Sequence, residues 1–354
     1  MRFDLPSLKQ SSFSPNILCF NWNSNKLPLC GAYVFDDNHN PLEKKSDNCY
    51  NPLFFQSIYE NILMHDPMIC VFVTEGDPEN KTYFHSTFLP ENMHYYKLIA
   101  NDKFSNDEST LRMSIYIKYD DTITKVIELN DGWLFSDNHY QCELKYDPRS
   151  TKALALYLDT IYGIFAFVGI QVPDKSSNGE VCVEMADRKF VRNKDVDYVF
   201  LMGDFSNDYL LSQKEYNNFA LVDKIHTDSI PPTYCEGSIS PQLYPNYNIR
   251  RPELDRMSPQ LYPKVTGSYK EANDGRYNIS WHDRIFYKTI NKDNDNIISC
   301  ISYQTVNNYP MLSSPQSQHM GILGVFEMIP NTVSDDEKLV FTKSYAGFNF
   351  GRRG

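Results

Sequence analysis

Short apolar runs, separated by polar turns, recur along the whole chain and predict a protein rich in β-sheet. Between the first two runs, Phe54, Ile58 and Ile62 recur every four residues, which predicts a helix that ends at Asp66 and Pro67. The second run is apolar almost throughout, a pattern typical of a strand covered on both faces. The predicted strands cover residues 16–23, 68–75, 111–119, 152–158, 161–172, 197–205, 284–288 and 320–328.

The spacing of these elements predicts an α/β (α+β) domain whose helices pack on the outside of the sheets. Residues 235–275 differ in composition, because Pro, Tyr, Asn and Ser dominate and the motif "SPQLYP" occurs twice. Two copies are too few for a solenoid, so we interpret the segment as a long loop, either a recognition lid or a plain Pro-rich insertion. The chain then divides into an N-terminal lead (1–14), one domain (15–330) that contains this insertion, and a C-terminal tail (331–354).

The composition is typical of a globular protein, and the net charge argues against one class of partner. Hydrophobic residues make up 41% and aromatic residues 14% of the chain, enough for a large core. The net charge of −11 argues against a nucleic-acid partner, because phosphate backbones are bound by clustered Lys and Arg. The longest apolar stretch is too short to span a bilayer, and the eight cysteines lack metal-site spacing. We therefore expect no transmembrane segment and a cytoplasmic location, with peripheral attachment to a membrane as the alternative.

Polar residues stand where the predicted strands end, and these positions carry the candidate chemistry. The five residues are Asn23, Glu75, Asp204, Asp283 and His319. Taken one at a time, each has a structural explanation as a turn cap or a solvated strand end. Taken together, they gather where open sheets place their active sites.

The same five residues have the chemistry of metal-assisted phosphoryl hydrolysis. Glu75 and Asn23 offer the oxygen ligands that Mg²⁺ prefers. Asp204 can orient or deprotonate the attacking water. Asp283 can hold His319 in one tautomer and keep it protonated against the charge that develops on phosphorus.

Several motifs together resemble those of the inositol polyphosphate 5-phosphatases, which belong to the endonuclease/exonuclease/phosphatase superfamily. The motifs are "NWN" (21–23), "TE" (74–75), "STKALAL" (150–156), "VFLMGDFS" (199–206), "PPTY" (231–234), "SWHDRIFYK" (280–288) and "SQHMGILGVFE" (317–327). Their order and approximate spacing follow the family over about residues 15–330. The most specific piece is Pro-Thr-Tyr followed by Ser-Trp-x-Asp-Arg-Ile.

The resemblance implies a four-layer sandwich of two packed β-sheets flanked by helices, as in the endonuclease/exonuclease/phosphatase fold. It also implies a Mg²⁺-dependent phosphomonoesterase that acts on inositol polyphosphates or phosphoinositide lipids. By motif position, Asn23 and Glu75 match the family's metal-shell residues and Asp204 its water-activating aspartate. Asp283 and His319 match its aspartate-histidine dyad.

The chain departs from the family pattern at several site positions. Ser206 stands where the family has an Asn that holds the scissile phosphate, and Gln318 stands where it has an Asp near the metal. A strand-end His-Leu pair is replaced by Gln171 and Val172. Because the loss of one transition-state donor costs about 10²- to 10³-fold in rate, two such losses would leave little activity.

Basic residues supply candidates for phosphate binding. Lys152 matches the lysine of the family's Gly-Asn-Lys-Gly motif, and Lys270 and Arg276 lie at the end of the Pro-rich segment. Ordinary surface charge is the alternative for all three. We interpret Arg284, which follows Asp283, as a structural counter-charge.

Two functions from different classes follow. The first is the Mg²⁺-dependent phosphatase of inositol phosphates or phosphoinositides, with Ser206 in place of the usual Asn. The second is a catalytically degraded pseudophosphatase that keeps the fold as an interaction module and binds a protein or an inositol lipid through residues 235–275. A nuclease or sphingomyelinase of the same superfamily fits less well, since the chain is acidic.

Overall fold

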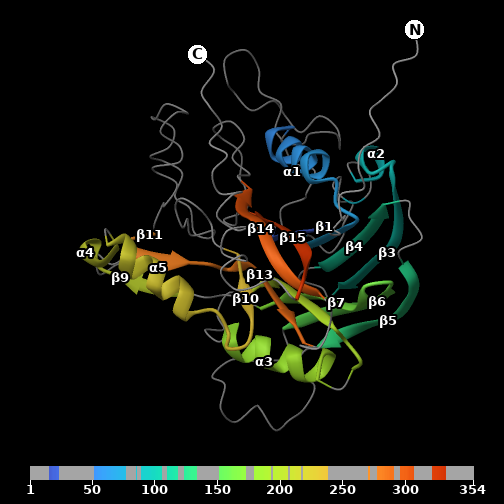
Figure 1. Cartoon of the computed structure of the whole chain (residues 1–354). Helices are drawn as coiled ribbons and strands as arrows, with labels where there is room; N and C mark the ends of the chain where they lie inside the picture. Colours follow the sequence, from blue (N-terminus) through green and yellow to red (C-terminus); the bar gives the residue numbers. More distant parts are fainter. Residues whose placement is uncertain are drawn as a thin grey trace, which may run out of the picture.

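A computed structural model gives the structure of the chain (Figure 1). It describes residues 16–23, 52–76, 85, 89–105, 110–118, 123–133, 151–172, 179–192, 194–205, 208–216, 218–237, 270–271, 277–290, 296–306 and 321–331.

Two large sheets lie face to face in the described part of the chain. The first has the strand order β14-β15-β1-β2-β4-β3, and the second has the order β10-β13-β8-β7-β6-β5. The first sheet consists of β1 (Asn16–Asn23), β2 (Ile69–Gly76), β3 (Tyr96–Ser105), β4 (Thr110–Lys118), β14 (Asn296–Val306) and β15 (Gly321–Pro330). The second consists of β5 (Ile123–Trp133), β6 (Lys152–Thr160), β7 (Gly163–Gln171), β8 (Tyr198–Asp204), β10 (Cys235–Glu236) and β13 (Asp283–Thr289).

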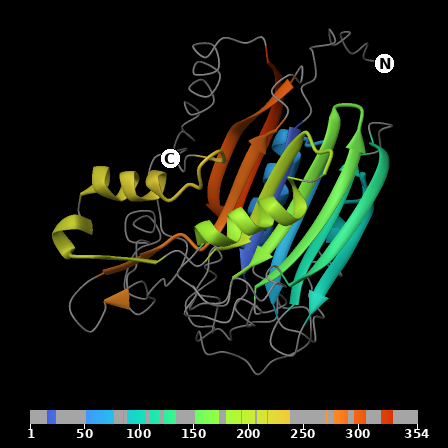
Figure 2. The same ribbon diagram turned by 90° about the horizontal axis from the view of Figure 1, so that it is seen from below.

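Each large sheet contains one parallel pair of neighbouring strands joined through a helix. β1 runs parallel to β2 with α1 (Pro52–His65) between them in sequence, and β7 runs parallel to β8 with α3 (Gly179–Phe190) between them. Parallel neighbours require such a crossover, which places a helix on a sheet face. α1 packs on the outer face of the first sheet and α3 on that of the second (Figures 1 and 2). The expected four-layer sandwich is therefore confirmed.

The alternation of side chains along each strand builds the core between the sheets. In β1, Ile17 and Cys19 enter the cluster between the sheets, whereas Leu18 and Phe20 face α1. All of β2 is buried, which confirms the expectation that both its faces are covered. The same period of two fixes which face each polar residue takes at the strand ends.

The predicted helix forms with the expected boundary. Ile58 and Ile62 of α1 are buried against the first sheet. Asp66 adopts a left-handed conformation, with φ of 43°, and its N–H donates to the Ile62 carbonyl. A left-handed residue followed by Pro67 is a common way to end a helix. Within the part of the chain that the structure describes, no helix is both long and apolar enough to cross a membrane.

A smaller unit stands beside the sandwich (Figure 2). It contains a short sheet of β11, β12 and β9, together with two helices. The remaining elements of the fold are α2 (Leu89–Asn92), β9 (Asp208–Leu211), α4 (Gln213–Tyr216), α5 (Phe219–Asp228), β11 (Lys270–Glu271) and β12 (Tyr277–Ser280). The segment expected to be one long loop, 235–275, begins with β10 and contains β11, while its residues 238–269 lie outside the described residues.

Candidate functional site

At one end of the sandwich, polar side chains replace the apolar ones that otherwise line the space between the sheets. Leu154, Phe167, Phe200 and Val73 belong to the core cluster between the sheets. In each of these four strands, a buried polar residue stands two or four positions away along the strand and therefore on the same face. These residues are Lys152, Gln171, Asp204 and Glu75. These polar residues therefore occupy positions of the inter-sheet face at the end of the core.

Strand register sets four of the polar residues side by side in the second sheet. Lys152 pairs with Gln171, Gln171 with Asp204, and Asp204 with Asp283 across four neighbouring strands. We call Lys152, Gln171, Asp204 and Asp283 the polar row. In the first sheet Asn23 pairs with Glu75. The parallel pairs of both sheets thus end in polar residues, the position where open sheets commonly bind ligands.

Hydrogen bonds connect the polar row to the first sheet. The Gln171 amide donates from Nε2 to Oε1 of Glu75. The Asn21 amide donates from Nδ2 to Oδ1 of Asp283 over 3.0 Å. Glu75, Asp204 and Asp283 therefore belong to one connected site, although they come from distant parts of the sequence.

A glycine explains why Asp204 can lie so close to Gln171. Gly203 has a φ of 155°, and a Cβ added there would come within 1.8 Å of the carbonyl oxygen of Ile170 on β7. A residue with a side chain could not be accommodated at this contact. The glycine of the Gly-Asp motif is therefore required by the close contact between β7 and β8, which the sequence alone does not indicate.

His282 is a site residue that the sequence analysis missed. Its Nδ1 lies 3.6 Å from Oδ1 of Asp204, and both side chains are buried. Its neighbour Trp281 is also buried, with its ring centroid 5.2 Å from that of His226. The contact depends on how β13 approaches β8, which no local pattern in the sequence indicates.

Arg284 belongs to a separate, closed network on the other face of β13. Its guanidinium donates to both carboxylate oxygens of Glu236 and to Oγ of Ser229. Tyr303 donates from its hydroxyl to Glu236 over 2.6 Å, and Nε2 of His226 lies 3.2 Å from the same carboxylate. We call these five residues the Arg284 network. The interpretation of Arg284 as a structural counter-charge is confirmed, with Glu236 as its partner.

The electrostatics of this network centre on Glu236. Burial would by itself raise the pKa of this carboxyl group, but Arg284 and His226 lower the pKa to about 2. Glu236 is therefore ionised at neutral pH, and its charge is balanced inside the fold.

The structure brings together five of the nine predicted site positions, places one elsewhere and does not describe the other three. Those that meet at the polar end are Glu75, Lys152, Asp204, Asp283 and, through its backbone pairing with Glu75, Asn23. Lys270 lies in β11, which pairs with β12 in the small sheet and not with the polar row. Ser206, Arg276 and His319 lie outside the described residues.

The side chains at this end fit a hard divalent cation in type. Glu75, Asp204 and Asp283 are buried carboxylates, and oxygen is the donor that Mg²⁺ and Ca²⁺ prefer. Across the ranges described above, no three His, Cys, Asp or Glu side chains lie close enough together to hold a metal ion. Mg²⁺ commonly uses only one or two protein carboxylates, with waters and substrate phosphate completing its shell, so Glu75 suits it.

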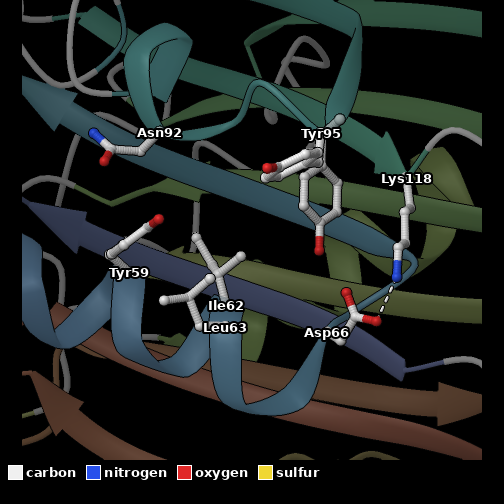
Figure 3. Close-up of a pocket in the computed structure, with 8 residues that line it drawn as sticks. Tyr59, Ile62, Leu63, Asp66, Asn92, Tyr95 and Lys118 are labelled. Carbon is white, nitrogen blue, oxygen red and sulfur yellow. Dashed lines mark hydrogen bonds and ion pairs between the residues drawn. The ribbon is translucent and has the colours of Figure 1, made fainter. Parts of the chain in front are cut away.

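A hollow of about 410 Å³ lies at the opposite end of β2 and β4, away from the polar row (Figure 3). Tyr59 and Leu63 of α1 form one wall, and Tyr95 stands across from them. Lys118 and Asp66 form an ion pair at its rim. This hollow contains none of the predicted site residues.

No known family model matches the sequence, and no curated protein matches it. Solved structures do resemble the fold. The nitrophorin of Cimex, in its ferrous nitric oxide complex, is 13% identical with a TM-score of 0.54, covering 89% of this chain and 98% of the nitrophorin. The inositol polyphosphate 5-phosphatase domain of SpSynaptojanin, in complex with inositol (1,4)-bisphosphate and calcium, is 16% identical with a TM-score of 0.51, covering 94% of this chain and 90% of that domain.

These two proteins differ in what they bind, so the likeness leaves function to be argued from the site. At such low identities the likeness establishes architecture alone. The chain has the α/β sandwich of the endonuclease/exonuclease/phosphatase fold.

Proposed function

We propose that the protein is a Mg²⁺-dependent phosphomonoesterase that removes phosphate from inositol polyphosphates or phosphoinositides. The observation that carries the proposal is the connection of Glu75 to Asp204 and Asp283 through the polar row at the carboxyl ends of the parallel strands. Buried carboxylates are costly unless they are paired or coordinate a cation. A site rich in buried carboxylates at this position suits a metal and a phosphate ester.

Each described residue has a role in this reaction. Glu75 and Asn23 would hold Mg²⁺, which would polarise the phosphoryl oxygens and offset their charge. Gln171 fixes Glu75, because its amide occupies one carboxylate oxygen. Asp204 takes the proton of the attacking water as the water oxygen bonds to phosphorus and the ester P–O bond breaks. The released inositol oxygen takes a proton from solvent.

Asp283 is the orienting carboxylate of the site. The Asn21 amide holds its Oδ1, and it stands beside Asp204 in the strand register. The role assigned to it by resemblance, to orient His319 so that the imidazolium steadies the phosphoryl group, stays a prediction. Ser206 would contact the scissile phosphate in place of the family's Asn.

Substrate recognition needs positive charge. Lys152, buried in the polar row, would contact the scissile phosphate, whereas Lys270 and Arg276 would contact phosphates further out on the inositol ring. An inositol bisphosphate occupies the SpSynaptojanin domain, whose fold is similar. A protein partner bound through residues 235–275, and peripheral attachment to phosphoinositide membranes from the cytosol, belong to the same proposal.

Phosphate release from a panel of soluble inositol phosphates and phosphoinositide vesicles, with Mg²⁺ or with a chelator, tests this function. Release that requires Mg²⁺ and disappears in Asp204→Asn and Asp283→Asn supports it. The matched control is Asp187→Asn, which removes a carboxylate of the α3 side that bonds to Tyr234 and Lys288 far from the polar row. Release from the control at the wild-type rate separates a lost site from lost folding.

The absence of release from wild type and variants alike would favour the pseudophosphatase that binds a partner without chemistry. The double variant Ser206→Asn with Gln318→Asp restores the family's residues at both positions. A higher rate in this variant would indicate a weakened but intact site. An unchanged rate would count against the roles given to Ser206 and to the residues around His319.

A further inference from the structure

We propose that His282 is a positioning residue for Asp204, holding this carboxylate in the orientation that water activation requires. The inference rests on the proposed function. Nδ1 of His282 lies 3.6 Å from Oδ1 of Asp204, and the two side chains are 1% and 2% exposed. At such burial the imidazole and the carboxylate face each other with little solvent screening.

The backbone keeps the imidazole in this place. The N–H of Phe205 donates to the carbonyl oxygen of His282 over 2.8 Å. This bond continues the pairing of β8 with β13 one step beyond the Asp204–Asp283 pair. Next to it, the ring of Phe205 packs against that of Phe286 with centroids 5.0 Å apart. His282 is thus fixed beside Asp204 by the strand pairing itself.

The groups around Asp204 show what the imidazole of His282 adds, namely an N–H that faces the carboxylate. Asp283 stands opposite Asp204 on β13, so two carboxylates face the same end of the core. From α3, Cys182 is a neutral thiol, since burial raises its pKa to about 12, with Thr151 opposing and Asp204 adding to the effect. From β7, Gln171 contributes an amide and no charge.

His282 can therefore supply the N–H that Asp204 needs. With Nδ1 protonated, the imidazole directs an N–H at Oδ1 of Asp204 across 3.6 Å, a contact longer than a hydrogen bond that would tighten when substrate binds, and it leaves Oδ2 to take the proton of the attacking water. The proton stays on Nδ1 throughout, so His282 orients the base and transfers nothing. Small misplacements of a catalytic group cost large factors in rate, so this support should be visible in turnover.

Two variants of His282 separate an orienting N–H from simple space filling. His282→Asn keeps an amide N–H near the place of Nδ1, and His282→Leu keeps much of the volume without any N–H. We expect the Leu variant to lower kcat on the order of 10²-fold with KM little changed, and the Asn variant to recover most of the loss. Equal kcat in wild type and both variants, with Asp204→Asn inactive, would overturn the positioning role and leave the proposed function standing.

A second measurement does not need activity. The ¹⁵N chemical shift of Nδ1 in His282, assigned by comparison with the Asn variant, should report a protonated Nδ1 in wild type and should change in Asp204→Asn. Asp187→Asn is the control and should leave it unchanged. If wild type releases no phosphate, the proposed function fails. The chemical shift of Nδ1 then tests the contact between His282 and Asp204 without any activity measurement. An Nδ1 chemical shift that is the same in wild type and in Asp204→Asn would overturn the inference, whether or not wild type releases phosphate.

Discussion

Two buried clusters of charge lie back to back on β13, and they differ in how their carboxylates are matched. In the Arg284 network, Glu236 meets a guanidinium, a hydroxyl and an imidazole, and its charge is balanced within the fold. At the polar end, Asp283 accepts from the amide of Asn21, which carries no charge. The first arrangement joins a buried acid to a base of the same chain, whereas the second gathers buried carboxylates, amides and the amine of Lys152 at one end of the core.

The difference between these clusters begins with two adjacent residues. Asp283 and Arg284 follow one another in the sequence, and the period of two in β13 turns them to opposite faces. Asp283 joins the space between the sheets, and Arg284 stacks 4.7 Å over the ring of Phe286 on the outer side. Asp283 and Arg284 therefore do not pair with each other. Asp283 belongs to the candidate site, and Arg284 belongs to the structural network around Glu236.

The largest expected effect is loss of activity without loss of stability. Asp204→Asn should lower phosphate release about 10²- to 10⁴-fold, the range for general acid–base groups, because the neutral amide cannot take a proton from water. The free energy of unfolding should change by less than about 1 kcal/mol, since the substitution removes a charge beside Asp283 and preserves the shape. Steady-state kinetics and urea unfolding on the same preparations measure both. A stability loss as large as the activity loss would assign Asp204 to the scaffold.

The opposite pattern is expected for the Arg284 network. Arg284→Met should lower the free energy of unfolding by about 3 to 5 kcal/mol, because it leaves the buried carboxylate of Glu236 without its main partner. Adding Glu236→Gln should restore part of this loss. Urea unfolding of wild type, both single variants and the double variant gives the coupling. Independent, additive effects would show that the two side chains do not stabilise each other.

The same network predicts how stability depends on pH. The pKa of Glu236 is about 2 in the folded protein against an ordinary value of 4.5. A lowered pKa means that the stabilisation is fully present above pH 4.5 and is lost as the pH falls toward 2. A difference of this size corresponds to about 3 kcal/mol.

Urea unfolding between pH 7 and pH 2.5 should therefore show wild type losing stability faster than Glu236→Gln. Parallel curves for wild type and Glu236→Gln would mean that Glu236 does not titrate in this window.

Much of the fold could be predicted from the sequence, and the omissions share a physical cause. Every predicted strand forms, because interior strands are covered on both sides and read as apolar runs. The three long strands that were missed, β3, β5 and β14, all lie at sheet edges. Edge strands are partly solvated and carry polar residues, so their alternation is weak. The crossover helix α3 was missed as well, since charged residues interrupt its apolar positions and leave no apolar run to mark it.

The site could be predicted as a set of strand ends but not as a network. Glu75, Asp204 and Asp283 stand out because each interrupts an apolar run at its boundary. Asn21 and His282 do not, since each acquires its partner only when β13 approaches β1 and β8. Gln171 was noticed only as a departure from the family, and the structure gives it one of the contacts that join the two sheets. Distances across sheets are a tertiary property, and periodicity does not encode them.

The smallest predicted effect tests the charge difference between the clusters directly. Gln171→Glu would place a second carboxylate against Glu75 without otherwise changing the polar row. Without divalent ions the two charges should repel and lower the free energy of unfolding by about 1 kcal/mol. With Mg²⁺ the added charge should bind the cation more tightly, so the rise in melting temperature on adding Mg²⁺ should exceed that of wild type.

Gln171→Leu is the matched control for this experiment, since it removes the same amide and adds no charge. It should lose stability with or without Mg²⁺ and should not enlarge the Mg²⁺ effect. Ca²⁺ provides a second comparison, because both ions prefer oxygen ligands but Ca²⁺ accepts more of them. If neither ion distinguishes Gln171→Glu from Gln171→Leu, no cation binds near Glu75. The polar row would then have to be stabilised from within the chain, as the Arg284 network is.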